Sequence, residues 1–172
     1  MTAPTPAPGS APGLMRRLAC FLYEGVLLFG IVMAAGFVYA IATGQRNALV
    51  GQHGLQLSLF VVLGAYFAWF WSHSGQTLAM QTWHIRLVGR DGGRVSALRA
   101  SARYLCAYLW FMPALVSVRL AGLSHSGGAT FGALAIGVLA YAALAWLHPQ
   151  RQYWHDAVCG TRLVTWKPQV RN

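Results

Sequence analysis

The stretch RRLACFLYEGVLLFGIVMAAGFVYAIA, residues 16–42, decides the class of fold. After two leading arginines it continues for 25 residues with one charge, Glu24. A helix needs about 20 mainly apolar residues to cross the hydrocarbon core of a bilayer, so this stretch is long enough. A signal peptide is the rival interpretation, because Ala40–Ala42 resembles a cleavage site. Its apolar core is typically about 7–15 residues long, however, so we expect a retained helix.

The composition of the whole chain has the same apolar character. Of 172 residues, 56% are hydrophobic and only 9% are charged, whereas a soluble domain usually carries about 25% charged residues. The net charge of +10 would by itself suggest nucleic acid. The charges, however, form short clusters between long uncharged runs, so we expect the lipid bilayer, and no nucleic acid, as partner.

Three further apolar runs predict three more membrane-spanning helices. They cover Leu55–Trp71, Tyr104–Leu123 and Ala129–Leu147, and the second of them contains Pro113 and should be kinked. With the N-terminus inside, the cytoplasmic segments hold eleven of the 13 Lys and Arg residues, as the positive-inside rule requires. The sequence therefore predicts an all-α membrane protein with four transmembrane helices. We expect it in the inner (plasma) membrane with both termini in the cytoplasm.

The loop between the second and third spans should have structure of its own. Residues 83–88 alternate partly, Asp91–Gly93 is a turn signal, and Val95 could return as a second strand, which predicts a short cytoplasmic β-hairpin. An amphipathic helix should follow, with Ser96 as its N-cap. Arginines on this segment would meet anionic lipid headgroups, and each contributes roughly 1 kcal/mol near the surface.

The chain divides into three parts on composition. Residues 1–14 are rich in Pro, Ala, Gly and Ser and should be a disordered lead-in. Residues 15–166 form the transmembrane domain, and residues 167–172 form a C-terminal tail.

Glu24 most needs explaining, because a carboxylate at the centre of a spanning helix costs roughly 2.5–3.5 kcal/mol. Arg17 lies seven positions earlier, which is about 20° short of two full helical turns, so both lie on one face. They are about 10 Å apart along the axis, and a direct pair would need both side chains to reach. Arg99 or Arg103, four residues apart near the start of the third span, could pair with Glu24 instead.

Several motifs, in order along the chain, resemble those of the RDD family, small bacterial integral membrane proteins named for an arginine and two aspartates. The motifs are Arg16–Glu24, Gly75–Met80, Ile85–Val88, Asp91–Gly92, Arg103–Leu105 and His155–Thr161. The resemblance covers about residues 15–165. It implies Arg17, Glu24 and Asp156 as the named trio, with the choice between Arg16 and Arg17 left open. Arg103 completes the expected charge network, and Arg16, Arg99, His155 and Thr161 are secondary candidates.

The chain departs from the family pattern at two places. The first family aspartate is Glu24 here, which keeps the charge but lengthens the side chain. The usual Gly-Lys after Gln-Thr-Leu is Ala79-Met80, which removes a cation from the loop. The second change weakens any claim that this loop grips a phosphate or another anionic solute.

Two functions follow as hypotheses. The resemblance implies transport, and buried acids beside arginines could bind a proton or ion as helices move. Four helices are too few to enclose a pore within one chain, so we expect a homo-oligomer or a membrane partner. Alternatively, the network only fixes helix packing in a structural or accessory protein.

An enzymatic function is the third possibility. His84, His148 and His155 could gather near Asp156, but no HExxH, GxSxG or matched Cys/His arrangement is present. Three cysteines without CxxC spacing give no disulfide framework or zinc site. We therefore expect no catalytic residues, no cofactor and no metal.

Overall fold

The computed structural model describes residues 9–44, 52–109, 111–123, 125–145 and 152–166. The described chain is mostly helical, with a two-stranded sheet. The helices are α1 (Leu14–Thr43), α2 (Gln52–His73), α3 (Leu78–Thr82), α4 (Ala97–Leu109), α5 (Met112–Leu120), α6 (Gly127–Leu144) and α7 (Trp154–Val158), and the strands are β1 (Ile85–Gly89) and β2 (Thr161–Thr165).

Three of these helices, α1, α2 and α6, are long and apolar enough to cross a membrane. Their outward faces carry exposed large apolar side chains, such as Phe29 and Phe37 on α1 and Phe131 on α6. Water does not favour apolar surface on this scale, whereas lipid does. The prediction of a helical membrane protein is confirmed.

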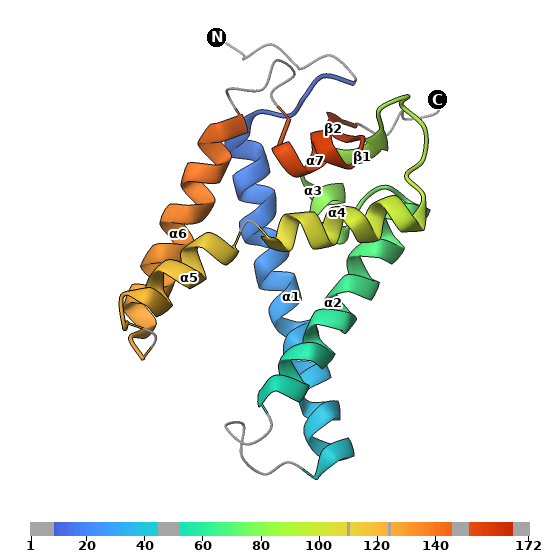
Figure 1. Ribbon diagram of the computed structural model, residues 1–172. Coiled ribbons are helices and arrows are strands. Elements are labelled where there is room, and N and C mark those ends of the chain that lie inside the picture. Colours follow the sequence, from blue (N-terminus) through green and yellow to red (C-terminus); the bar gives the residue numbers. More distant parts are fainter. Residues whose placement is uncertain (1–8, 45–51, 110, 124, 146–151, 167–172) are drawn as a thin grey trace.

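The predicted third span is not one helix. Its residues divide between the end of α4 and the nine-residue α5, which is too short to cross the bilayer alone. Pro113 lies in the first turn of α5, where its missing N–H does no harm, although within a longer helix it would leave a carbonyl without its donor. Figure 1 shows α4 lying across the direction of α1 and α2. Four spanning helices are therefore not confirmed.

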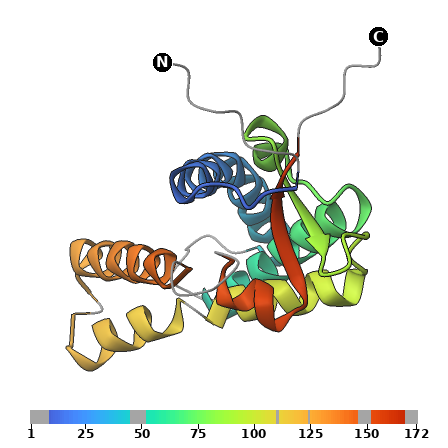
Figure 2. The same ribbon diagram turned by 90° about the horizontal axis from the view of Figure 1, so that it is seen from above.

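Helices α5 and α6 lie side by side in both ribbon views (Figures 1 and 2). Gly137 of α6 permits this approach, because a Cβ atom there would lie 3.2 Å from the Cβ of Ala114 on α5. Close helix packing over small residues is common in membranes. The last predicted run, Ala129–Leu147, becomes α6, although residues 146 and 147 lie outside the described residues.

The predicted β-hairpin is wrong in its second strand. β1 pairs antiparallel with β2 from the end of the chain, with Ile85 opposite Thr165. The expected turn does form, since the Gly89 N–H donates to the Gly93 carbonyl at 2.9 Å. Val95, however, is buried outside any strand and leads into α4. The predicted N-cap is confirmed, because the Arg99 N–H donates to the Ser96 hydroxyl at 3.4 Å.

The end of the lead-in lies along β2. The Gly9 N–H donates to the Thr165 carbonyl at 3.2 Å, and the Thr165 N–H donates to the Ser10 carbonyl at 2.8 Å. This part of the predicted lead-in therefore has hydrogen-bonding partners. Residues 1–8 and the tail, 167–172, lie outside the described residues.

The main buried core lies at one end of the molecule, where α3, α7, β1 and β2 gather beside the start of α1 and the end of α6 (Figure 1). We call this the sheet end. Its core includes Trp71, Ile85, Leu87, Tyr104 and Leu163. It fixes the end of α2, the sheet and α4 relative to one another, and it forms the wall on which the charged side chains lie.

Candidate functional site: buried charges at the sheet end

Asp156 on α7 is fully buried and forms an ion pair with Arg103 of α4. The Arg103 Nε donates to Asp156 Oδ1 at 2.6 Å. The Thr161 hydroxyl, at the start of β2, donates to the same oxygen at 3.2 Å. Three predicted residues thus meet at one carboxylate oxygen and connect α4, α7 and β2.

The guanidinium of Arg103 also lies over the indole of Trp71, 4.2 Å from the ring centroid. A cation over an aromatic face is attracted by the quadrupole of the ring, more strongly where water is excluded. Since Trp71 is on α2, this contact extends the link from α7 and β2 to a second helix.

The charge of Asp156 follows from these contacts. Burial raises the pKa of a carboxyl, but here the positive charge of Arg103 and the hydrogen bonds from Arg103 and Thr161 act in the opposite direction and prevail. The pKa of Asp156 lies below its ordinary value. The carboxylate is therefore ionised at neutral pH and paired with Arg103.

His155 is buried beside this pair and is held as a neutral ring. Its Nδ1 lies 2.5 Å from the Tyr141 hydroxyl, and its backbone N–H donates to the same hydroxyl oxygen at 3.2 Å. Burial lowers the pKa of His155 to about 4, although Asp156 acts in the opposite direction. At 3.6 Å from Asp156 Oδ1, the His155 Nε2 is too distant for a good hydrogen bond.

Arg17 on α1 is only 5% exposed, yet it has no anionic partner in the described part of the chain. Its Nε donates to the Pro12 carbonyl at 2.8 Å. Its guanidinium carbon lies 5.2 Å from the centre of the Tyr153 ring. A neutral carbonyl and an aromatic face thus take the place of a carboxylate.

Glu24, also on α1, accepts hydrogen bonds from two hydroxyl groups. The Tyr66 hydroxyl donates to Oε1 at 2.8 Å, and the Thr77 hydroxyl donates to Oε2. Among the described residues, no Arg or His nitrogen lies within 4.0 Å of this carboxylate. The sequence left open Arg17, Arg99 or Arg103 as its partner, and the structure pairs it with none of them.

The other two secondary candidates, Arg16 and Arg99, lie outside the buried cluster of charges. The Arg16 Nη2 donates to the Thr165 hydroxyl, which connects α1 to β2. Arg99 is exposed one turn before Arg103.

Sequence reasoning missed the neutral members of the site. Tyr66, Thr77, Tyr141 and Tyr153 supply hydroxyls or rings to the charged groups. A usable signal existed, because a buried tyrosine in an uncharged run needs a partner for its hydroxyl. Thr77 stands inside one of the quoted motifs.

Arg17, Glu24, Arg103 and His155 all line one cavity of about 500 Å³. Most of its remaining wall is apolar and comes from α1, α2, α4 and α6. Within the described ranges, no three His, Cys, Asp or Glu side chains come together as metal ligands. The cavity therefore combines a few buried charges with a long apolar surface.

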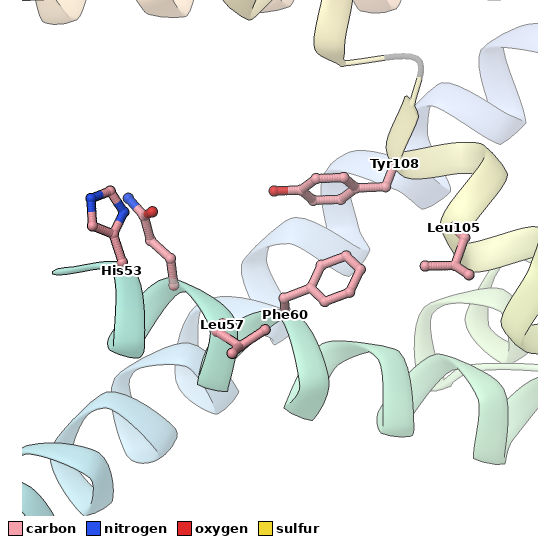
Figure 3. A pocket seen from close by; sticks show the side chains of 6 residues that line it. His53, Leu57, Phe60, Leu105 and Tyr108 are labelled. Carbon is pink, nitrogen blue, oxygen red and sulfur yellow. The ribbon is translucent and has the colours of Figure 1, made fainter. Parts of the chain in front are cut away.

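A second pocket, of about 480 Å³, lies between the first half of α2 and α4 (Figure 3). The figure shows His53, Leu57, Phe60, Leu105 and Tyr108 around a wide opening. None of the candidate site residues lines it. We place the candidate site in the first cavity.

Comparison with known families matches residues 11–160 to the RDD family. No curated protein and no solved structure matches the chain. The matched segment begins before the Arg16–Arg17 pair and ends after Asp156, so it includes both buried acids and every residue that lines the cavity except Leu163. The chain therefore belongs to the RDD family.

Proposed function

We propose that this protein transports a small solute across the membrane. Glu24 would bind a proton or a monovalent cation during transport. The observation that carries the proposal is the cavity, which Arg17, Glu24, Arg103 and His155 line together from α1, α4 and α7. Cavities of about 300–1,000 Å³ with a few polar groups are typical ligand sites.

Glu24 suits the exchangeable role because its partners are neutral. Two hydroxyls stabilise the carboxylate without cancelling its charge. A proton or cation could therefore neutralise Glu24 without first breaking an ion pair. Asp156 cannot act in this way, because Arg103 already neutralises it.

We further propose that the sheet end faces the cytoplasm of a bacterial cell. Eight of the arginines lie on elements at or beside this end: Arg16, Arg17, Arg86, Arg90, Arg94, Arg99, Arg103 and Arg162. Positive charge favours the cytoplasmic side. The exposed arginines on and before α4 would meet anionic headgroups. A homo-oligomer or a membrane partner would supply the rest of the path that the solute takes across the membrane.

The experiment is a flux screen on purified protein in proteoliposomes, with a pH or sodium gradient as the driving force. We expect wild-type protein to give gradient-linked flux and Glu24→Gln to abolish it. Asp91→Asn is the matched control, because Asp91 is an exposed acid in the turn after β1. Equal flux through wild type and Glu24→Gln, with both folded, would reject the proposal.

A second candidate is a structural or accessory function, favoured by the Arg103–Asp156 pair. Asp156 is fully buried, and it connects α4 with the α7–β2 unit. Buried ion pairs can specify an arrangement without adding net stability. Under this alternative, Glu24→Gln would disturb folding rather than flux.

A further inference from the structure

The cavity contains a buried cation, Arg17, that forms no ion pair within the described part of the chain. Arg17 is only 5% exposed, lines the cavity, and has no carboxylate within 4.0 Å among the described residues. Its Nε is used by the Pro12 carbonyl, and its two Nη atoms have no hydrogen-bond partner within the described ranges. A buried charge normally requires a partner, so an anion from outside the chain would complete this site.

The cavity is polar at one end and apolar at the other. Arg17 and His155 lie at the sheet end, whereas Leu28 lies eleven residues further along α1, about 16 Å along the helix axis. Leu134 also lines the cavity, and it lies farther from the sheet end than Tyr141 because α6 runs towards that end (Figure 1). A ligand that fills this space would therefore have a charged head and an apolar tail.

From this we infer that the cavity binds a single-chain amphiphilic anion, with a carboxylate or phosphate head against Arg17 and an alkyl chain between α1 and α6. The inference rests on the proposed function only in that the cavity must be a ligand site. Glu24 would lie beside the chain rather than the head, because it is seven residues beyond Arg17. A proton on Glu24 would remove its repulsion of the incoming anion, so anion and proton binding would favour each other.

The test measures displacement of a dansyl-labelled undecanoate from protein in phosphatidylcholine nanodiscs, with empty discs as background. We expect palmitate to displace the probe at a concentration at least tenfold below that of hexadecanol, since only the acid can pair with Arg17. Arg17→Gln should raise the palmitate concentration required by about ten- to hundredfold. Arg17→Lys should keep much of the preference. Arg119→Gln, at an exposed arginine in the last turn of α5, should leave the preference unchanged.

Two further arms cover misfolding and the source of the anion. Leu134→Trp narrows the apolar end of the cavity, so it should weaken palmitate binding, while the shorter octanoate should still displace the probe. This variant tests the inference even if Arg17→Gln does not fold. Lysophosphatidylglycerol, a phospholipid with one acyl chain, should reduce probe binding in an Arg17-dependent manner if the natural anion has a phosphate head, and should have no effect if the natural anion is a free carboxylic acid.

Equal displacement by palmitate and hexadecanol, or equal behaviour of Arg17→Gln and Arg119→Gln in folded protein, would overturn the inference. The proposed function can fail separately. Wild-type protein that binds palmitate through Arg17 but shows no gradient-linked flux would retain the ligand and reject transport. Flux that depends on Glu24 without palmitate binding would do the reverse.

Discussion

Asp156 has a charged partner and Glu24 has neutral ones, and this difference separates their expected roles. The Arg103 guanidinium holds Asp156 as a carboxylate, with help from the Thr161 hydroxyl. Among the residues that the structure describes, Glu24 accepts hydrogen bonds from the hydroxyls of Tyr66 and Thr77 and from no charged group. Substitution of the first acid should therefore affect folding, and substitution of the second should affect ion handling.

Asp156→Asn should lower the free energy of unfolding by about 3–5 kcal/mol, because Arg103 would be left buried without a counter-charge. Replacement of both residues by Leu and Met should recover most of the loss, since an apolar pair of similar size leaves no charge behind. Denaturant titration of purified protein in detergent measures both. A loss below about 1 kcal/mol for Asp156→Asn would show that the pair does not hold α4 to α7.

The buried His155 should make stability depend on pH. Because burial lowers its pKa to about 4, the unfolded chain takes up a proton before the folded chain does. Stability should be full above about pH 6.5, the ordinary histidine value, and should fall as the pH drops towards 4. The groups facing His155 are Asp156, Arg103, Tyr141 and Tyr153, and Asp156 titrates only below this range.

Thermal unfolding between pH 7.5 and 4.5 checks this, with His155→Gln as the comparison. The substitution should flatten the pH dependence by an amount equivalent to at most about 3 kcal/mol. An unchanged slope in His155→Gln would assign the pH dependence to other groups.

The charged part of the site could be predicted from the sequence, but its pairing could not. Arg17, Glu24 and Asp156 stand out because an acid-poor, apolar chain rarely carries charges without need. Which arginine meets which acid depends on how α4 crosses the bundle, and periodicity within one helix says nothing about that. The result is the Arg103–Asp156 pair and a Glu24 bound by hydroxyls.

At the level of secondary structure, Gly75 lies in the turn between α2 and α3, where the chain contacts β1. It has φ of +73°, and a Cβ atom there would lie 2.7 Å from the Leu87 carbonyl oxygen. The Leu87 N–H donates to the Gly75 carbonyl at 2.8 Å, so the strand lies directly against this turn. No side chain fits at this position.

Gly75→Ala should therefore destabilise the protein more than Gly44→Ala, which ends α1 with φ of +64° but has open space around it. The control should cost about 1–2 kcal/mol, the usual penalty of left-handed backbone for a residue with Cβ. Unfolding midpoints in detergent compare the two variants. An equal loss of stability in the two variants would indicate that the Leu87 backbone moves away from the added Cβ atom at little cost.

The sequence identified the spanning runs well and the connection between them poorly. Apolar length alone located α1, α2 and α6. The run from Tyr104 to Leu123 counted as a span because hydropathy ignores direction, whereas α4 lies across the bundle with Arg103 buried. The strand partner was also missed, because β1 and β2 are separated by most of the second half of the chain.

At the level of the whole molecule, the two ends differ in packing. One end has a buried core with polar and apolar side chains, and the other end consists of helices with exposed apolar side chains. The sheet end contains most of the buried core, while α1 has exposed apolar residues along its length, such as Phe37 and Ile41. Lipid must surround these helices. The start of α1, the sheet and the end of α6 lie together (Figure 1), so we expect them on one face of the membrane.

Cysteine accessibility in intact cells tests this arrangement most directly, in a variant with Cys20, Cys106 and Cys159 replaced. Thr43→Cys at the end of α1 and Leu123→Cys between α5 and α6 should react with an impermeant maleimide from outside. Arg94→Cys, between β1 and α4, should react only after the membrane is permeabilised. If Arg94→Cys reacted in intact cells, or Leu123→Cys reacted only after permeabilisation, the orientation and the path of the chain would both be contradicted.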